Sequence, residues 1–264
     1  MNVIFLGQGK LFYDCLNALL DNEFSDDYHL KCIVTSKEFY ANLSKKYSLQ
    51  EQITFIPNSS RNEDFIIEAI EKLEVDVLIS VQHRWILSEK ILSKLNGNSF
   101  NLHNAKLPEF KGYNSISHVI YSNASKHFVT IHKIEPEVDS GSIVAESEIE
   151  VSSDETALSL YKKTIPAAKV LFVRFLSLLS DSSLVLKPHL GRGSFYSKNS
   201  LDDLRVLKFS DCEETLCRKV RAVYFPPYEP AYFLKNEQKL YCLPNNSASN
   251  LWLNELPLNK SPWD

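Results

Sequence analysis

The 264-residue sequence lacks a regular cysteine pattern, because its five cysteines form an odd set without framework spacing. A disulfide scaffold of the kind found in small secreted domains is therefore not predicted. Cys212 and Cys217 have no second Cys or His pair nearby, so we expect no zinc site and no other metal. We interpret the cysteines as free thiols in a reducing cytoplasm; they are Cys15, Cys32, Cys212, Cys217 and Cys242.

The sequence also lacks a long hydrophobic run and an excess of basic residues. The most apolar stretch, 170–173, is followed at once by Arg174, so no membrane-spanning segment and no membrane partner are predicted. The formal net charge of −4 argues against nucleic acid as a partner. No basic region precedes a long apolar segment near Met1, so we expect no signal peptide.

A complete glycine-rich dinucleotide motif is missing as well. Gly7 and Gly9 stand at a predicted strand–helix junction, but Phe12 occupies the position of the third glycine. No acidic residue ends the second predicted strand. We therefore interpret Gly7 and Gly9 as a tight turn, with a helix N-terminus that can still favour a phosphate group.

Alternating strand and helix patterns are what the first half of the chain does contain. Apolar runs at 2–6, 29–35, 53–55 and 75–81 are separated by amphipathic helical patterns. Further strands are predicted at 100–103, 127–134 and 142–151. This alternation predicts an α/β fold with a Rossmann-like, mostly parallel sheet and helices on both faces.

The pattern changes in the second half. A long helix is predicted from Asp154, which suits an N-cap, to about Leu179, with a kink or break at Pro166. Short strands follow from Leu184, then a brief helix and a β-hairpin, and finally a tail rich in Asn, Ser and Pro. We predict a catalytic domain over 1–183 and a smaller mixed α+β region over 184–264, which carries the hairpin and the irregular tail.

Asn101, His103 and Asp139 are the side chains that best indicate chemistry. Residues 99–103 alternate as a short strand, so Asn101 and His103 share one face. An amide N–H can hold the oxygen of a tetrahedral intermediate, and an imidazole can handle the proton of an amine. A carboxylate at Asp139 can orient that imidazole. The set predicts acyl transfer to an amine without a covalent enzyme intermediate.

The runs FNLHNAKLPEFKGYNSI and VTIHKIEPEVDSGSIV resemble formyltransferases that use N10-formyltetrahydrofolate. That family includes glycinamide ribonucleotide, methionyl-tRNA and sugar-nucleotide N-formyltransferases, and the resemblance covers roughly residues 1–180. Its motif of Asn-x-His, Leu-Pro, a Gly-containing loop and Asp-x-Gly assigns the catalytic roles to Asn101, His103 and Asp139. Asn104-Ala105 departs from the family pattern, in which Ser or Pro is commoner after the histidine.

The resemblance also implies where the reduced folate binds. In the family, the end of the fourth strand and the loop carrying the aspartate line the pterin pocket. We expect Trp85, Ile86 and Leu87 mainly to be core residues, although Leu87 is also counted as a pocket residue. The implied donor-binding residues are Gln82, His83, Arg84, Leu87, Glu135, Val138 and Asp139.

The C-terminal region points to the acceptor. Arg221, followed by Phe225-Pro226-Pro227-Tyr228, offers a cation, a stacking face and a rigid turn suited to a nucleoside diphosphate. A packed turn with core aromatics is the alternative. We expect the sugar to lie against the loop 111–114, so that the acceptor-binding residues are Arg84, Lys111, Tyr113, Asn114, Arg221, Phe225 and Tyr228.

By resemblance, the reaction is expected to be transfer of a formyl group to a nucleotide-linked amino sugar. A dTDP-linked 4-amino-4,6-dideoxyglucose, used for O-antigen or another surface polysaccharide, is the first choice, and a homodimer is plausible. One alternative is methionyl-tRNA formyltransferase, which nine Lys/Arg against seven Asp/Glu over 190–242 disfavour. The other is a catalytically silent sugar-nucleotide binder of the same fold.

Overall fold

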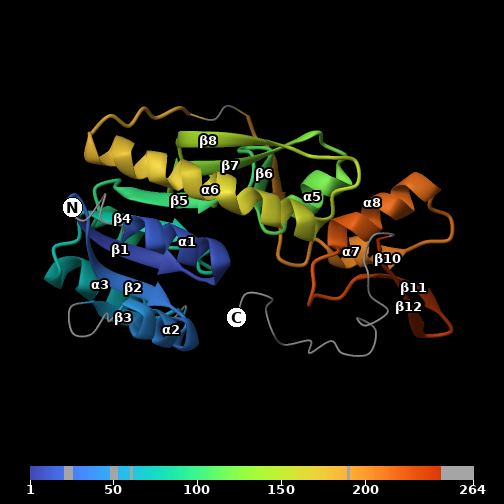
Figure 1. Ribbon diagram of the computed structural model, residues 1–264, viewed down its shortest axis with the longest axis horizontal. Coiled ribbons are helices and arrows are strands. Elements are labelled where there is room, and N and C mark those ends of the chain that lie inside the picture. Colours follow the sequence, from blue (N-terminus) through green and yellow to red (C-terminus); the bar gives the residue numbers. More distant parts are fainter. Residues whose placement is uncertain (21–25, 48–52, 60–61, 189–190, 245–264) are drawn as a thin grey trace. The chain divides into compact units, whose positions relative to one another are not determined.

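A computed structural model of the chain describes residues 1–20, 26–47, 53–59, 62–188 and 191–244, so the predicted tail after Pro244 lies outside the described residues (Figure 1). The strands are β1 (Asn2–Gly7), β2 (His29–Thr35), β3 (Thr54–Pro57), β4 (Val77–Val81), β5 (Ser99–His103), β6 (Phe110–Gly112), β7 (Lys126–Lys133), β8 (Ile143–Glu150), β9 (Ser194–Tyr196), β10 (Val206–Leu207), β11 (Ala231–Lys235) and β12 (Gln238–Cys242). The helices are α1 (Gly9–Leu19), α2 (Lys37–Tyr47), α3 (Glu63–Lys72), α4 (Glu89–Ser93), α5 (Ser115–Tyr121), α6 (Ala157–Ser180), α7 (Asp202–Arg205) and α8 (Glu213–Val223).

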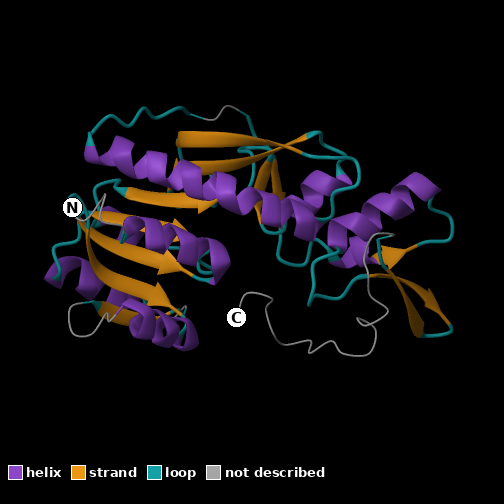
Figure 2. Ribbon diagram, viewed as in Figure 1, coloured by secondary structure: helices purple, strands orange, loops and turns teal. Residues whose placement is uncertain are grey.

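The main sheet has seven strands in the order β3-β2-β1-β4-β5-β7-β8 (Figure 2). The pairs β1–β2, β2–β3, β1–β4 and β4–β5 are parallel, whereas β7 runs antiparallel to β5. The strand order reverses direction at β1, which is the topology of doubly wound α/β folds. The predicted fold class is confirmed, including a small mixed region with a hairpin formed by β11 and β12.

Helices cover both faces of this sheet because the central strands are apolar on both sides. Ile4 and Leu6 of β1 pack in a cluster with residues of α3 and α4, among them Ile66 and Ile70. Phe5 points to the opposite face, where its ring lies 4.8 Å from Phe12 of α1 and 5.9 Å from Phe172 of α6. The core is therefore in two layers, as the alternation of side chains along a strand requires.

The turn between β1 and α1 needs glycine at Gly7. The φ angle of Gly7 is +153°, and a Cβ atom there would lie 1.9 Å from the carbonyl oxygen of Val81. Val81 is the last residue of β4, so this close approach fixes the end of β4 against the start of α1. The geometry supports the tight-turn interpretation of Gly7 and Gly9.

The predicted start of the long helix was wrong. The helix α6 begins at Ala157 rather than near Asp154, because Thr156 caps it: the backbone N–H of Ser159 donates to Thr156 Oγ1 at 3.1 Å, and that of Thr156 donates to Ser159 Oγ at 2.9 Å. This reciprocal pair satisfies two N–H groups of the first turn, as a capping box does. The helix is also not broken at Pro166, which lies inside it.

The chain divides into two compact units, each assembled from separate stretches of sequence. Unit 1 comprises Met1–His103, Val129–Ser147 and Ala167–Gly191, and unit 2 comprises Asn104–Phe128, Glu148–Pro166 and the described part of Arg192–Asp264. Unit 2 has its own small core, formed by Leu201, Leu204, Leu207, Val223 and Ala231. Across the residues that the structure describes, no helix is long and apolar enough to cross a membrane.

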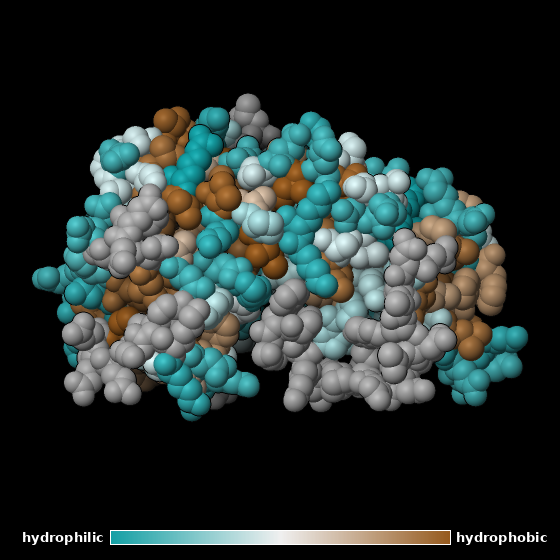
Figure 3. Space-filling view, in the orientation of Figure 1, coloured by the Kyte–Doolittle hydropathy of each residue, from teal (hydrophilic) through white to brown (hydrophobic). Residues whose placement is uncertain are grey.

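The hairpin of unit 2 keeps several apolar side chains at the surface. Leu234 and Leu240 are 56% and 48% exposed, and Phe209, which stacks on Phe233 at 4.6 Å, is 75% exposed. Figure 3 shows hydrophobic surface near the place of β11 and β12 in Figure 1. Such a surface is compatible with the predicted homodimer, which stays a prediction.

Candidate functional site

Three neighbouring strands of unit 1 bring polar side chains to one face of the sheet. Asn101 of β5 lies opposite Ser80 of the parallel strand β4 and opposite His132 of the antiparallel strand β7. Residues opposite each other on paired strands project to the same face. His103, two residues after Asn101, shares that face and ends β5.

The amide of Asn101 is held from both sides. Ser80 Oγ donates to Asn101 Oδ1 at 2.9 Å, and Asn101 Nδ2 lies 3.2 Å from His132 Nε2. His132 Nδ1 lies 2.7 Å from the carbonyl oxygen of Lys133, which can only accept. In the neutral imidazole the proton is therefore on Nδ1, and Nε2 accepts from Asn101. The second hydrogen of Asn101 Nδ2 has no acceptor among the described residues.

Asp139 lies beside two imidazoles. Its Oδ2 is 3.6 Å from His103 Nδ1, and its Oδ1 is 3.4 Å from His132 Nε2. The side chains of His103 and Asp139 are only 10% and 9% exposed, and that of His132 is 2% exposed. These distances exceed those of good hydrogen bonds but allow an ion pair with whichever imidazole is protonated.

The loop that carries Asp139 is held tightly against β7. Asp139 has a φ of +50°, in the left-handed region, which Asp adopts more readily than most residues. A Cβ atom at Gly141 would lie 2.0 Å from the carbonyl oxygen of Lys133, so only glycine fits there. Lys133 N–H also donates to Ser142 O at 2.9 Å. The backbone therefore fixes the carboxylate of Asp139.

The structure brings the predicted residues Asn101, His103 and Asp139 together, and it adds Ser80 and His132. The contacts of His132 with Asn101 and Asp139 are those of a supporting residue. The alternating run VTIHK indicated that His132 faces one side of a strand, but the partner strand was not visible in the sequence. No sequence signal pointed to Ser80.

The end of β4 carries the predicted donor-binding residues of unit 1. His83 is largely buried, its Nδ1 has no hydrogen-bond partner among the described residues, and burial lowers its pKa to about 4. Arg84 is exposed. When the amide of Gln8 is oriented with its oxygen toward Arg84, Arg84 Nη2 donates to that oxygen at 2.8 Å. Gln82 has a φ of +56°, which marks the turn where the strand ends.

The three residues after Arg84 do not behave alike. Leu87 is 7% exposed and belongs to the core cluster below the sheet, as expected for a core residue. Trp85 and Ile86 are 46% and 72% exposed, so the core interpretation was wrong for both. Exposed apolar side chains of this size mark a surface that contacts either a ligand or another part of a protein. In the Asp139 loop, Glu135 is exposed and Val138 is half-buried.

The predicted acceptor loop lies in unit 2 and is bound to another segment of that unit. β6 pairs with β9, and Tyr113 N–H donates to Tyr196 O at 2.8 Å. Asn114 Nδ2 donates to Lys198 O at 3.1 Å and lies 3.3 Å from Ser200 Oγ. The amide of Asn114 thus holds the loop, while Tyr113 is 43% exposed and Lys111 is half-buried in β6.

The other predicted acceptor residues of unit 2 lie on and after α8. Arg221 Nη1 donates to the carbonyl oxygen of Glu155 at 3.0 Å. The Phe225 ring lies 5.3 Å from Tyr161, so it packs within the unit, and the Tyr228 ring, 6.0 Å from Phe225, is 52% exposed. The packed-turn alternative therefore describes Phe225 better than Tyr228.

The cluster in unit 1 can support a reaction in which oxygen gains negative charge while a nitrogen loses a proton. Asn101 presents a pre-oriented N–H, and His103 beside Asp139 can take up or release a proton. Because the strands and the loop fix these groups, little reorganisation is needed during the reaction.

Comparison with known proteins agrees with this chemistry. The family model described as Formyl transferase matches residues 1–176. The chain is 26% identical over 249 residues to a methionyl-tRNA formyltransferase of Thermotoga maritima, covering 91% of the chain and 78% of the relative. It is 30% identical over 193 residues to a GDP-perosamine N-formyltransferase of Brucella melitensis biotype 1, covering 73% of each.

A solved structure has the same fold. It is an N-formyltransferase of Helicobacter canadensis in complex with folinic acid and dTDP-3-aminofucose, with a TM-score of 0.71 and 19% identity. The match covers 90% of this chain and 85% of that one.

Proposed function

The chain belongs to the formyl transferase family and is a formyltransferase, and on this premise we propose that it transfers a formyl group from N10-formyltetrahydrofolate to the amine of a nucleotide-linked amino sugar. The observation that carries the proposal is the hydrogen-bonded line Ser80–Asn101–His132, with Asp139 beside His103. A catalytically silent protein that only binds a sugar nucleotide would not need these side chains, and we would expect it to have lost at least one of them.

The bound donor would supply the formyl carbon, and the side chains of unit 1 would act around it. Asn101 Nδ2 donates its second hydrogen to the formyl oxygen as that oxygen gains charge. His103 takes the proton that the attacking amine loses and returns it to the donor nitrogen as the bond between that nitrogen and the formyl carbon breaks. Asp139, 3.6 Å from His103 Nδ1, stabilises the imidazolium that forms in between. Ser80 and His132 keep the amide of Asn101 in its orientation.

The end of β4 fits a reduced folate as the donor. A pterin ring is flat and apolar on its faces, and it carries hydrogen-bonding groups along its edge. His83 offers a buried Nδ1 that has no partner among the described residues, and its lowered pKa keeps the ring neutral near pH 7. A neutral imidazole can pair with such an edge without placing a buried charge beside it. We assign Gln82, Arg84, Glu135 and Val138 to the same donor site, as the resemblance implies.

The acceptor is proposed to be an amino sugar on a nucleoside diphosphate, with dTDP-4-amino-4,6-dideoxyglucose as the first choice. Support comes from the Brucella relative, which is named for a nucleotide-linked sugar, and from the Helicobacter protein, which binds dTDP-3-aminofucose. The diphosphate needs a cation, for which Arg84 and Arg221 are the candidates, and Tyr228 offers an exposed face for the base. The product would serve surface polysaccharide synthesis in the cytoplasm.

Transfer to methionyl-tRNA is the second candidate, because the Thermotoga relative matches 91% of the chain. A tRNA acceptor requires many phosphate contacts and therefore a basic surface. The formal charge of −4, with a balance of only nine Lys/Arg against seven Asp/Glu over 190–242, favours a small acceptor instead.

The decisive experiment assays the protein with formyl donor and a panel of dTDP- and GDP-linked 3-amino and 4-amino sugars, beside methionyl-tRNA. We expect a formylated sugar product to be detected by mass spectrometry, and a reduced folate to raise the melting temperature by mass action. Formylation of methionyl-tRNA at a comparable rate would overturn the choice of acceptor. Activity with another acyl donor and no folate-dependent shift would overturn the choice of donor.

A further inference from the structure

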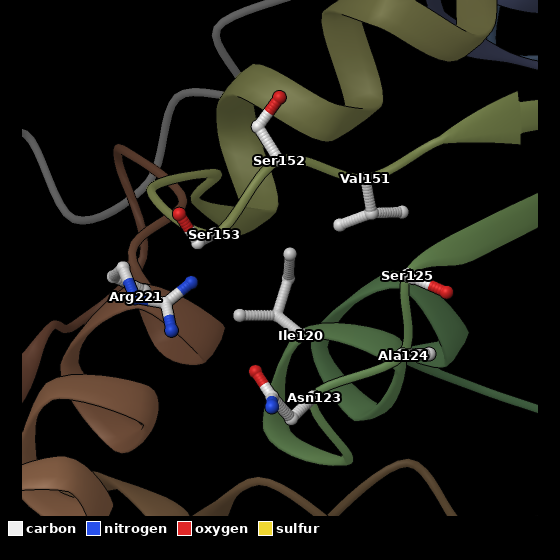
Figure 4. A pocket seen from close by; sticks show the side chains of 8 residues that line it. All are labelled: Ile120, Asn123, Ala124, Ser125, Val151, Ser152, Ser153 and Arg221. Carbon is white, nitrogen blue, oxygen red and sulfur yellow. The ribbon is translucent and has the colours of Figure 1, made fainter.

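A small cavity in unit 2 has the donors of an anion site. It is lined by residues from three elements: the turn after α5, the segment after β8, and α8. The lining residues are Ile120, Asn123, Ala124, Ser125, Val151, Ser152, Ser153 and Arg221. Figure 4 shows the guanidinium of Arg221 and the amide of Asn123 turned toward the same space.

The charge in this cavity has one sign. Arg221 is the charged member of the lining, and no lining residue is Asp or Glu. The remaining polar groups are the amide of Asn123, which faces the cavity, and the hydroxyls of three serines, which point away from it in Figure 4. The carboxylate of the nearby Glu155 is occupied by Ser159 and Lys163. A ligand here therefore meets a cation and an amide, with no opposing carboxylate in the lining.

The hydrogen bond that anchors Arg221 leaves two nitrogens of its guanidinium available to a ligand. Nη1 donates to Glu155 O at 3.0 Å, which fixes the guanidinium, and Nε and Nη2 have no partner among the described residues. The Nε–Nη2 edge is the arrangement that binds two oxygens of one anion. The hydroxyls of Ser152 and Ser153 and the amide of Asn123 also have no hydrogen-bond partner among the described residues.

The volume limits the ligand. At about 210 Å³ the cavity is smaller than the roughly 300–1,000 Å³ of sites that enclose drug-sized molecules. A whole nucleotide therefore does not fit, but a single phosphate group does.

We infer that this cavity binds one phosphate group, with Arg221 as the cation and the amide of Asn123 as a second hydrogen-bond donor. The phosphate belongs either to a nucleoside diphosphate or to a free inorganic anion. Only the first source rests on the proposed function. Phe225 and Tyr228 are not part of the lining, so the pocket itself recognises phosphate and not a base.

Binding of inorganic phosphate to the full chain, without formyl donor or amino sugar, tests the inference by calorimetry at constant ionic strength. Wild type should bind phosphate saturably, and Arg221→Ala or Arg221→Gln should bind about tenfold more weakly or worse, as expected for loss of a charge-assisted hydrogen bond. Arg218→Ala removes the same charge from the same helix outside the lining, and it should bind like wild type.

Asn123→Gly serves as a second variant if the Arg221 variants do not fold, because Asn123 has a φ of +56° that glycine accepts. It should weaken phosphate binding severalfold. Absence of saturable binding to wild type, or equal weakening by Arg218→Ala, would overturn the inference.

Thymidine diphosphate distinguishes the two sources of the phosphate group. If it displaces inorganic phosphate and binds more weakly to Arg221→Gln than to wild type, the nucleotide supplies the group; otherwise a free anion does. Because no transfer is measured, failure of the proposed reaction would leave this result unchanged.

Discussion

The candidate catalytic cluster of unit 1 and the candidate acceptor residues of unit 2 are built in different ways. In unit 1, Ser80, Asn101 and His132 bond to one another through side chains, and all come from paired strands. In unit 2, Arg221 and Asn114 bond to backbone carbonyl oxygens of other segments. A substitution in the cluster of unit 1 therefore disturbs several side chains that hold one another in place. A substitution of Arg221 or Asn114 in unit 2 mainly removes one contact.

Removal of a member of the catalytic cluster should have the largest effect. Asn101→Ala should lower kcat by about 10² or more, because an oxyanion donor is lost. His103→Asn and Asp139→Asn should be at least as damaging. Steady-state kinetics with the formylated product measured directly, and melting curves to verify folding, provide the check. Near-normal transfer by all three variants would show that the site has been assigned wrongly.

A supporting contact should matter less, and Ser80 offers a matched test. Ser80→Ala removes the hydroxyl that orients Asn101 and should lower kcat by roughly fivefold to tenfold, with little change in KM. Ser99→Ala is the control, because Ser99 Oγ is also buried but has no partner among the described residues. Equal effects of the two substitutions would mean that Ser80 acts through packing alone.

In unit 2, a single exposed aromatic should affect binding and leave the chemistry intact. Tyr228→Ala should raise the KM for the sugar nucleotide severalfold, as expected for loss of one base-stacking face. The folate-dependent rise in melting temperature should be unchanged, since we assign the donor to unit 1. Tyr241→Ala on the hairpin, another exposed tyrosine, is the control. A fall in kcat without a change in KM would contradict the assignment.

The smallest effect concerns acid stability, to which each unit contributes a histidine with a lowered pKa. Burial lowers the pKa of His118 in unit 2, and that of His83 in unit 1, from 6.5 to about 4. Between these values the unfolded chain binds more protons, so stability is fully present above about pH 6.5 and is lost as the pH falls toward 4. In the His118→Gln variant, the free energy of unfolding measured with urea should depend less on pH across this window than it does in wild type. The His29→Gln variant, which changes an exposed position, should keep the wild-type pH dependence.

The sequence could predict the features that depend on local spacing. The shared face of Asn101 and His103 follows from the two-residue period of a strand, and the alternation of elements specified the sheet. The contact between Asn101 and His132 could not be predicted, because the register of β5 against β7 depends on residues about thirty positions apart. The start of α6 was misjudged since several capping residues precede it, and only the structure distinguishes Thr156 from Asp154.

Asn101 and Asp139 differ in the free energy that is needed to displace each of them. β5 lies between β4 and β7, so the backbone of Asn101 opens only when the interior of the sheet opens, and its amide should exchange hydrogen among the slowest in the protein. Asp139 lies on a connecting loop between β7 and β8, where local opening is cheaper and exchange is faster. The oxyanion donor is therefore as hard to displace as the interior of the sheet, whereas the carboxylate, although fixed in the folded state, is the first of the two to be lost when the protein begins to open. Conditions that loosen the loop should therefore lower activity before they unfold the sheet.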